Sequence, residues 1–216
     1  MRQVLIRPPA ARREERRQDR RNAILAVAMQ SFIEHGYAAT SMSSIAAAAG
    51  GSKATLWAHF ASKAELFEAA LGEATAAHQR DLAALLDPRD NLVDALRRYC
   101  RRFMQTIISP SAIALHRLIE AEGARFPEVG AIFYERAPKT TLTALARYID
   151  AAMATGALRR DDAAQAAQMI ISLCLGGSRQ RILWSQPAPD QAAIECEADF
   201  VADIFLRAYA PIARQG

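Results

Sequence analysis

Apolar residues recur at three- and four-residue intervals along most of this chain. From Arg21 onward, Ile24, Leu25, Ala28 and Phe32 fall on one face of a helix. Glycine and proline are scarce, and the sequence has no alternating β-branched run of strand length. The pattern therefore predicts an all-α protein of about nine helices.

Glycine, proline and capping residues bound the expected helices. Gly36-Tyr37 ends the first, and Asp87-Pro88 ends the fourth because proline cannot continue a helix. Pro138 lies inside the seventh, which we expect to be kinked or split there. Asp161-Asp162 is a plausible cap for the eighth. The predicted ranges are 17–35, 42–49, 53–59, 63–85, 90–108, 111–122, 127–154, 163–185 and 190–209.

Two short helices, 42–49 and 53–59, are joined by Gly50-Gly51 and form a predicted helix-turn-helix. Such a pair can place its second helix in the major groove of DNA. The long helix 63–85 is expected to connect this small head to a larger body. We therefore divide the chain into a basic arm that is disordered without DNA, a three-helix DNA-binding head and a helical body, over residues 1–15, 16–65 and 66–216.

Composition argues against several classes of protein. No apolar run approaches the ~18 residues of a membrane span, and no apolar stretch follows the N-terminal arginines as in a secretory signal. Cys100, Cys174 and Cys196 are odd in number and far apart. They favour reduced thiols in a cytoplasmic protein and lack zinc spacing. No Ser/His/Asp, paired-carboxylate or phosphate-loop arrangement is present, so we expect no enzyme, metal or cofactor.

Charge is concentrated at the N-terminal end. Residues 1–63 hold ten lysines and arginines against four acidic residues, a net of +6, whereas the rest of the chain has a net of −2. A basic end attracts the phosphate backbone of DNA, although a solvated tail has the same composition. Six arginines of this end are candidates to follow the backbone or enter the minor groove. They are Arg12, Arg13, Arg16, Arg17, Arg20 and Arg21.

An ordered set of residues spans the head: Gly36-Tyr37, Thr40, Ile45-Ala46, Gly50, Ser52-Lys53, Thr55-Leu56, His59-Phe60, Lys63 and Leu66-Phe67. With this set, residues 21–67 resemble the DNA-binding domain of the TetR (tetracycline-repressor-like) family of bacterial transcription regulators. The later helices resemble the family mainly in number and length. The resemblance implies double-stranded DNA, in a pseudo-palindromic operator, as a partner.

Physical roles can be assigned to the positions that the family uses for DNA contact. Gly50 can adopt the positive φ of a sharp turn, and Ser52 is a good N-cap. Lys53 can donate to guanine, and the methyl groups of Ala54 and Thr55 can meet thymine. The candidates for contact with phosphate are Trp57, His59 and Lys63, and those for the backbone or a base edge are Ser41 and Ser43.

Some head residues depart from the family pattern or have a second interpretation. Gly51 stands where an apolar residue is usual, Ala54 where glycine is frequent, and Trp57 where tyrosine is usual. Trp57 can pack against the head instead of contacting phosphate, and His59 can serve as a cap. The departures bear on individual contacts and not on DNA binding itself.

The last two predicted helices, near 163–185 and 190–209, are expected to form a homodimer, as an intersubunit four-helix bundle. Their apolar stripes are Met169, Ile170, Leu173 and Gly177, then Ile194, Val201, Ile204, Phe205 and Ala208. Gly176-Gly177 inside a helix costs about 1 kcal/mol relative to alanine. Close approach of another helix would account for the two glycines, as would internal packing or a local bend.

The resemblance implies an effector pocket among the predicted helices 90–154. Its candidate lining residues are Phe103, Met104, Ile107, Leu115, His116, Phe133 and Tyr134, with Arg117, Glu120 and Glu122 as further polar anchors. An apolar stripe such as Phe103 to Ile107 is also typical of a hydrophobic core without a ligand site.

The sequence as a whole predicts a homodimeric repressor that a small-molecule effector releases from its operator. The alternatives are a chromosome-associated or interaction protein of the same fold without a ligand, an activator, and an all-α enzyme.

Overall fold

The computed structural model describes residues 9–211. Its described residues form helices and no strand, in agreement with the all-α prediction. The helices are α1 (Pro9–Ala39), α2 (Met42–Ala48), α3 (Lys53–His59), α4 (Lys63–Ala84), α5 (Leu92–Ile107), α6 (Pro110–Glu122), α7 (Pro127–Arg136), α8 (Pro138–Ala154), α9 (Ala163–Gly176), α10 (Ser178–Leu183) and α11 (Gln191–Ala208). None of the described helices combines the length and apolarity needed to cross a membrane.

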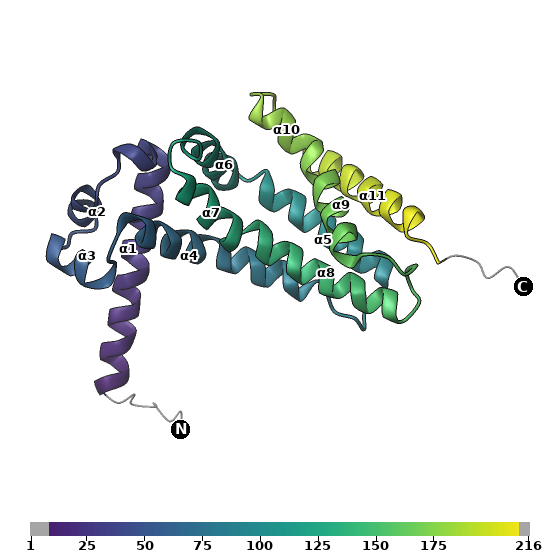
Figure 1. The fold of residues 1–216 in the computed structure, drawn as a ribbon, viewed down its shortest axis with the longest axis horizontal. Coiled ribbons are helices and arrows are strands. Elements are labelled where there is room, and N and C mark those ends of the chain that lie inside the picture. The colour runs from purple at the N-terminus through teal and green to yellow at the C-terminus, as the bar shows by residue number, and fades with distance from the viewer. Residues whose placement is uncertain (1–8, 212–216) are drawn as a thin grey trace, which may run out of the picture.

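The head lies at one end of an elongated molecule, and α4 leads from it into the body (Figure 1). In the body, α5 packs against α11, α8 packs against α9, and the arginines Arg97 and Arg101 of α5 form ion pairs with Asp203 and Asp199 of α11. The head therefore sits far from α11 and the C-terminal end.

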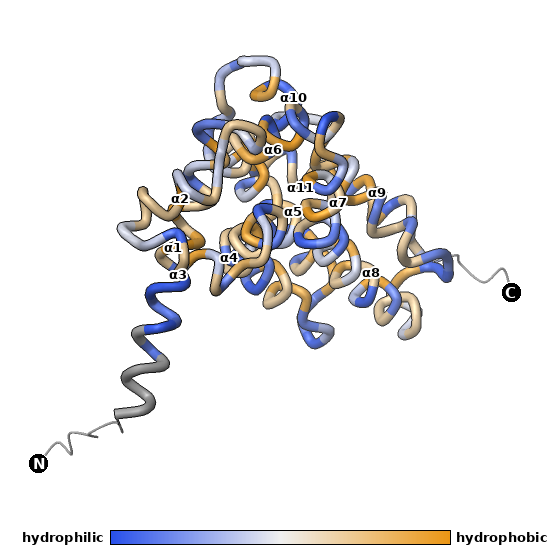
Figure 2. Tube along the Cα trace, turned by 60° about the vertical axis from the view of Figure 1, so that its left-hand side comes forward, coloured by the Kyte–Doolittle hydropathy of each residue, from blue (hydrophilic) through white to orange (hydrophobic). Residues whose placement is uncertain are grey.

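Helix α1 begins at Pro9, earlier than predicted, so residues 9–15 are helical where the sequence analysis expects a disordered arm. Proline is favoured at the first helical position, and the alanine, arginine and glutamate residues that follow are strong helix formers. The remaining arm residues, 1–8, lie outside the described residues. Figure 2 shows the hydrophilic, blue part of α1 extending away from the rest of the molecule.

The predicted breaks at Gly36, at Asp87-Pro88 and at Pro138 are present. Gly36 has φ 83° and ψ 161°, which interrupts α1 and redirects the chain toward Thr40. Ala137 separates α7 from α8, and Pro138 opens α8 at its first position, so the predicted seventh helix is split.

The predicted eighth helix is wrong as a continuous element, because it ends at Gly176 and a short α10 follows. Gly177 has φ −94° and ψ −113°. The carboxylate of Glu197, from α11, occupies the space that a Cβ on Gly177 would need and accepts a hydrogen bond from Ser178 N at 3.0 Å. The sequence left open whether the glycine pair serves a helix of another subunit, internal packing or a local bend. At Gly177 the structure shows a local bend with internal packing.

The hydrophobic core has two parts. One fills the body between α5, α8, α9 and α11, and the other fills the head and continues into α6 and α7. Phe32, Tyr37 and Phe67 pack ring against ring in the head, and Phe126, just before α7, packs on Tyr37 with ring centroids 5.3 Å apart. The head is thus joined to α6 and α7 by shared core and not by α4 alone.

Four of the nine residues in the apolar stripes predicted for the dimer lie in the protomer's own core. Ile170, Ile194, Val201 and Phe205 are buried within the single chain. The residues of the two stripes that remain at least partly accessible are Met169, Leu173, Gly177, Ile204 and Ala208. A helix in a bundle first buries its most apolar face against its own neighbours, and periodicity does not separate that face from a second, intersubunit one.

Candidate DNA interface and effector cavity

The turn between α2 and α3 has the geometry that the sequence predicts. Gly50 has φ 63°, and its N–H and that of Gly51 donate to the carbonyls of Ala47 and Ala46. Ser52 caps α3 by accepting a hydrogen bond from Thr55 N at 3.1 Å, and its hydroxyl lies 2.8 Å from that of Thr55. The start of α3 is therefore held firmly at the surface of the head.

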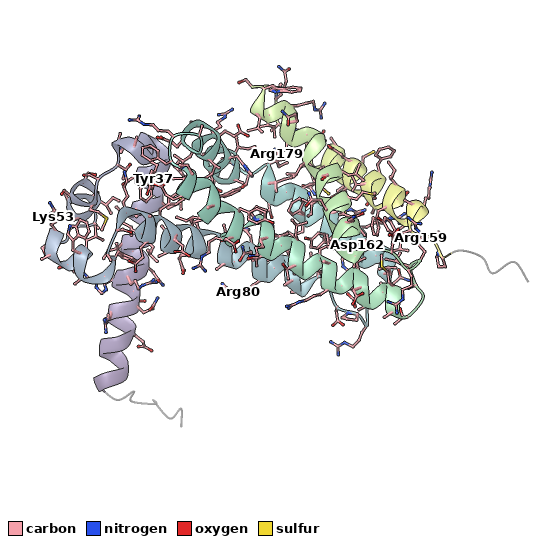
Figure 3. The ribbon with its side chains drawn as sticks, viewed as in Figure 1. Tyr37, Lys53, Arg80, Arg159, Asp162 and Arg179 are labelled. Atoms are coloured by element: carbon pink, nitrogen blue, oxygen red, sulfur yellow. The ribbon has the colours of Figure 1, made fainter. Side chains whose placement is uncertain are left out.

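The exposed face of this unit carries most of the predicted DNA-contact residues. Ser43, Lys53, Ala54 and Trp57 are exposed, and Lys53 lies at the outer end of the head (Figure 3). Leu56 and Phe60, on the other side of α3, are buried in the head core. The orientation leaves the first turn of α3 free to enter a groove.

The polar candidates around this face differ in how far they are already engaged. Ser41 caps α2 in a capping box with Ser44, accepting from Ser44 N at 3.0 Å. His59 is partly buried, and its ring centroid lies 6.3 Å from that of Phe60. Two arginines at the start of the head flank α3. The Arg20 guanidinium lies beside Gly51, and that of Arg21 stacks over Phe60 at 5.6 Å.

Lys63 does not have the outward position expected of a phosphate ligand. Its ammonium donates to the carbonyl oxygens of Tyr37 and Thr40, at 2.7 and 3.1 Å, and lies 4.3 Å from the Tyr37 ring centroid. Burial lowers its pKa. Lys63 ties α4 to the chain that leaves Gly36, a structural role that motif spacing alone does not indicate.

We expect the two glycines of the turn to respond oppositely to alanine. Gly50→Ala should lower the free energy of unfolding by about 1 kcal/mol, because a Cβ disfavours positive φ. Gly51 lacks positive φ, and its nearest obstacle is the flexible end of Arg20 at 3.3 Å. Gly51→Ala should therefore raise that free energy by roughly 0.4–1 kcal/mol through the unfolded chain. Urea unfolding measures both, and an equal loss in the two variants would contradict this account.

A cavity of about 370 Å³ lies between α1, α4, α5, α6, α7, α8, the end of α9 and the start of α10. Its wall is mainly apolar, and its volume falls in the range of small-molecule sites. Five predicted lining residues do line it: Phe103, Ile107, Leu115, His116 and Phe133. It also takes in Met29 and Ile33 of α1, and His78 of α4, which the sequence analysis missed.

Two predicted lining residues lie elsewhere. Met104 is fully buried in the body core, and Tyr134 is 52% exposed on the outer side of α7. Successive residues of a helix are rotated by about 100°, so neighbours of Phe103 and Phe133 face other directions. None of the polar anchors Arg117, Glu120 and Glu122 lines the cavity. Glu122 instead accepts a hydrogen bond from Ala38 N in the head at 3.2 Å.

The polar groups of the cavity are few. His116 packs edge-on against Phe133 with centroids 5.2 Å apart. Burial, and then the charge of Arg179, lower the pKa of His116 to about 4, so its imidazole is neutral at pH 7. His78 has a buried Nδ1 with no hydrogen-bond partner among the described residues. The threonines Thr75, Thr106 and Thr141 donate to carbonyls of their own helices.

Among the side chains that the structure describes, no group of three or more histidines, cysteines, aspartates or glutamates could hold a metal ion. The arrangement accordingly offers an exposed helix for DNA and a mainly apolar cavity for a small molecule.

Comparison with known proteins matches both parts of the chain. Residues 24–70 match the family model of bacterial regulatory proteins of the tetR family, and residues 94–211 match that of the AefR-like transcriptional repressor C-terminal domain. A TetR-family regulator from Mesorhizobium loti has a similar structure, with a TM-score of 0.79 and 25% identity over 94% of this chain and 99% of that one.

Two further relatives have names that describe different kinds of regulator, one responsive to flavonoids and one an activator. The flavonoid-responsive regulator FrrA has a TM-score of 0.77 and 35% identity over 91% of this chain and 100% of its own. The transcriptional activator FasR of Mycolicibacterium smegmatis is 38% identical over 85 residues, 39% of this chain. That match spans about a third of FasR, 32% of its length.

Proposed function

This chain belongs to the TetR family of bacterial transcriptional regulators, and from that premise we propose that it is a homodimeric repressor released from its operator by a small-molecule effector. DNA binding through the helix-turn-helix is a property of the family. Repression is supported by the AefR-like repressor model, which covers residues 94–211. The match to the activator FasR is shorter.

The observation that carries the proposal is the position of the cavity. Met29 and Ile33 belong to α1, the first helix of the head, and form part of the cavity wall. Ala74, Thr75 and His78 add α4, the helix that links head and body. A molecule that fills the cavity therefore contacts both helices and can change the position of the head relative to the body.

Release follows from the requirement for two heads. Helix-turn-helix dimers read half-sites about one helical turn apart, so a change in head spacing lowers operator affinity. We assign the dimer surface to α9 and α11, where Met169 and Phe200 are large, exposed apolar side chains, 41% and 64% exposed. Each ligand-bound dimer would then fit the half-site spacing less well.

The effector class is suggested by one relative. FrrA is named as flavonoid-responsive, and it shares 35% identity with this chain over its full length. A planar aromatic effector suits a cavity lined by Phe103 and Phe133.

The test is fluorescence anisotropy with duplexes tiled across the region upstream of the protein's own gene, repeated at several salt concentrations. We expect tight binding to one pseudo-palindromic tile with two chains per half-site pair, and release by at least one member of a flavonoid and fatty-acid panel. Equal binding to every tile with a steep salt dependence, or affinity that no panel member changes, would contradict the proposal. A rise in expression of the adjacent genes on deletion separates repression from activation.

A further inference from the structure

Arg179 is a buried cation with no partner among the residues that the structure describes. Its side chain is 9% exposed, and it forms neither a hydrogen bond nor an ion pair with any other described residue. Its Nε is buried without a hydrogen-bond partner, and burial lowers its pKa. The α5 arginines Arg97 and Arg101, in contrast, pair with aspartates of α11. A buried, unpaired guanidinium is strongly unfavourable, and a ligand that pairs with it would remove that cost.

The fold holds Arg179 at the cavity. The break at Gly177 starts α10, and Glu197 of α11 accepts hydrogen bonds from both the backbone N–H and the hydroxyl of Ser178. Arg179 is the next residue and lines the cavity, where α10 lies close to α6 (Figure 3). The bend at Gly177 thus interrupts an apolar helix and places a positive charge at the end of the mainly apolar cavity.

The surroundings of Arg179 suit an anion. It is the one charged residue among the described residues that line the cavity. The acid whose charge acts on it, Glu120 of α6, is exposed and lies outside that lining. His116, neutral at pH 7, shares the same region, and His78 has its unpaired Nδ1 in the wall. The site therefore combines one cation, the neutral imidazole of His116 and the unpaired Nδ1 of His78 with an otherwise mainly apolar wall.

We propose, building on the effector-release function above, that the effector is a mainly apolar molecule with one anionic oxygen group, a carboxylate or a phenolate, that pairs with Arg179. The apolar part lies along Phe103, Leu115 and Phe133, and His116 hydrogen-bonds the anionic group or a neighbouring oxygen. Such an anion draws α10 and α6 together. Helix α6 carries Glu122, which holds Ala38 of the head, so this movement reaches the head directly.

The experiment compares two probe pairs by isothermal titration calorimetry on the full chain: decanoate with decanol, and a hydroxyflavone, above the pKa of its phenol, with its methyl ether. Each pair differs in the anionic oxygen. We expect the wild type to bind the anion of at least one pair about tenfold or more tightly than the neutral partner, because charge-assisted hydrogen bonds are the stronger ones. A preference in the first pair identifies a carboxylate, and one in the second a phenolate.

Arg179→Met keeps a long apolar side chain and removes the charge. We expect it to reduce the preference for the anion to within about twofold without lowering Tm, since an unpaired buried charge is lost. Arg181→Met is the matched control, because Arg181 lies on the same helix, is exposed and donates to Ser178 Oγ at 3.3 Å. It should keep the wild-type preference.

Three results would overturn the assignment. The wild type could bind both members of each pair equally, it could bind neither anion, or Arg179→Met could keep the wild-type preference. Operator binding is measured separately in the same samples. An Arg179-dependent preference in a chain that binds no tile specifically would contradict the repressor function and leave this assignment standing. Release from the operator by neutral and anionic probes alike would support the repressor function and contradict the assignment of Arg179 to an anion.

Discussion

Lys53→Ala is expected to weaken binding to the operator by roughly 10- to 100-fold, since a specific base contact is worth about 1–3 kcal/mol. Lys53 is exposed in the first turn of α3, next to the Ser52 cap, and has no resolved internal partner among the described residues. Fluorescence anisotropy on the operator tile and on a scrambled duplex measures the effect. A loss confined to the operator indicates a base contact. A uniform loss with the salt slope reduced by about one indicates phosphate contact.

Lys139→Ala is the matched control for this variant. It removes the same charge from α8 in the body, where Lys139 pairs with Glu135 at 2.7 Å. We expect operator affinity to change less than about twofold, because surface ion pairs contribute little. If the Lys53 variant behaves like this control, α3 does not enter DNA as we infer.

Phe67→Ala is expected to lower the free energy of unfolding by about 3–5 kcal/mol, a large share of the roughly 5–15 kcal/mol available to a folded protein. Phe67 is fully buried, and its ring lies edge-on to Phe32 and Tyr37 with centroids 5.2 and 5.5 Å away. Urea unfolding followed by circular dichroism measures the change. Because the head core continues into α6 and α7, we expect one transition in place of a separate loss of the head.

Tyr134→Ala is the control for removal of an aromatic ring. Tyr134 is 52% exposed on α7, and we expect a change within about 0.5 kcal/mol. A Phe67 variant as stable as this control would mean that the head core does not depend on its aromatic cluster. Loss of circular-dichroism signal in two separate steps would mean that head and body unfold independently.

The head was the most predictable part of the molecule because its signals are local. Gly50 needs positive φ, Ser52 caps the helix that follows it, and Leu56 and Phe60 are a helical turn apart. Each of these depends on neighbours within a few residues. Lys63 was the exception, since its carbonyl partners Tyr37 and Thr40 lie 26 and 23 residues away.

The body was predictable as helices but less so as a site. Periodicity indicated that Phe103, Met104 and Ile107 are buried, and they are. It could not show that Phe103 and Ile107 line a cavity while Met104 fills the core, because both environments select apolar residues. Nothing in the spacing singled out Arg179, because Arg181 stands two residues further on the same short helix and the two differ only in burial.

The sequence by itself determined the all-α class, the helix-turn-helix, its glycine turn and its caps, because these depend on residue types at short, regular spacing. The tertiary structure decided which apolar faces meet one another, where space is left between them and which charges that space contains. Met29 of α1, His78 of α4, Phe133 of α7 and Arg179 of α10 line one cavity although long stretches of chain separate them. These four residues come together because helices distant in sequence pack against one another. The spacing of residues within a single helix does not predict that packing.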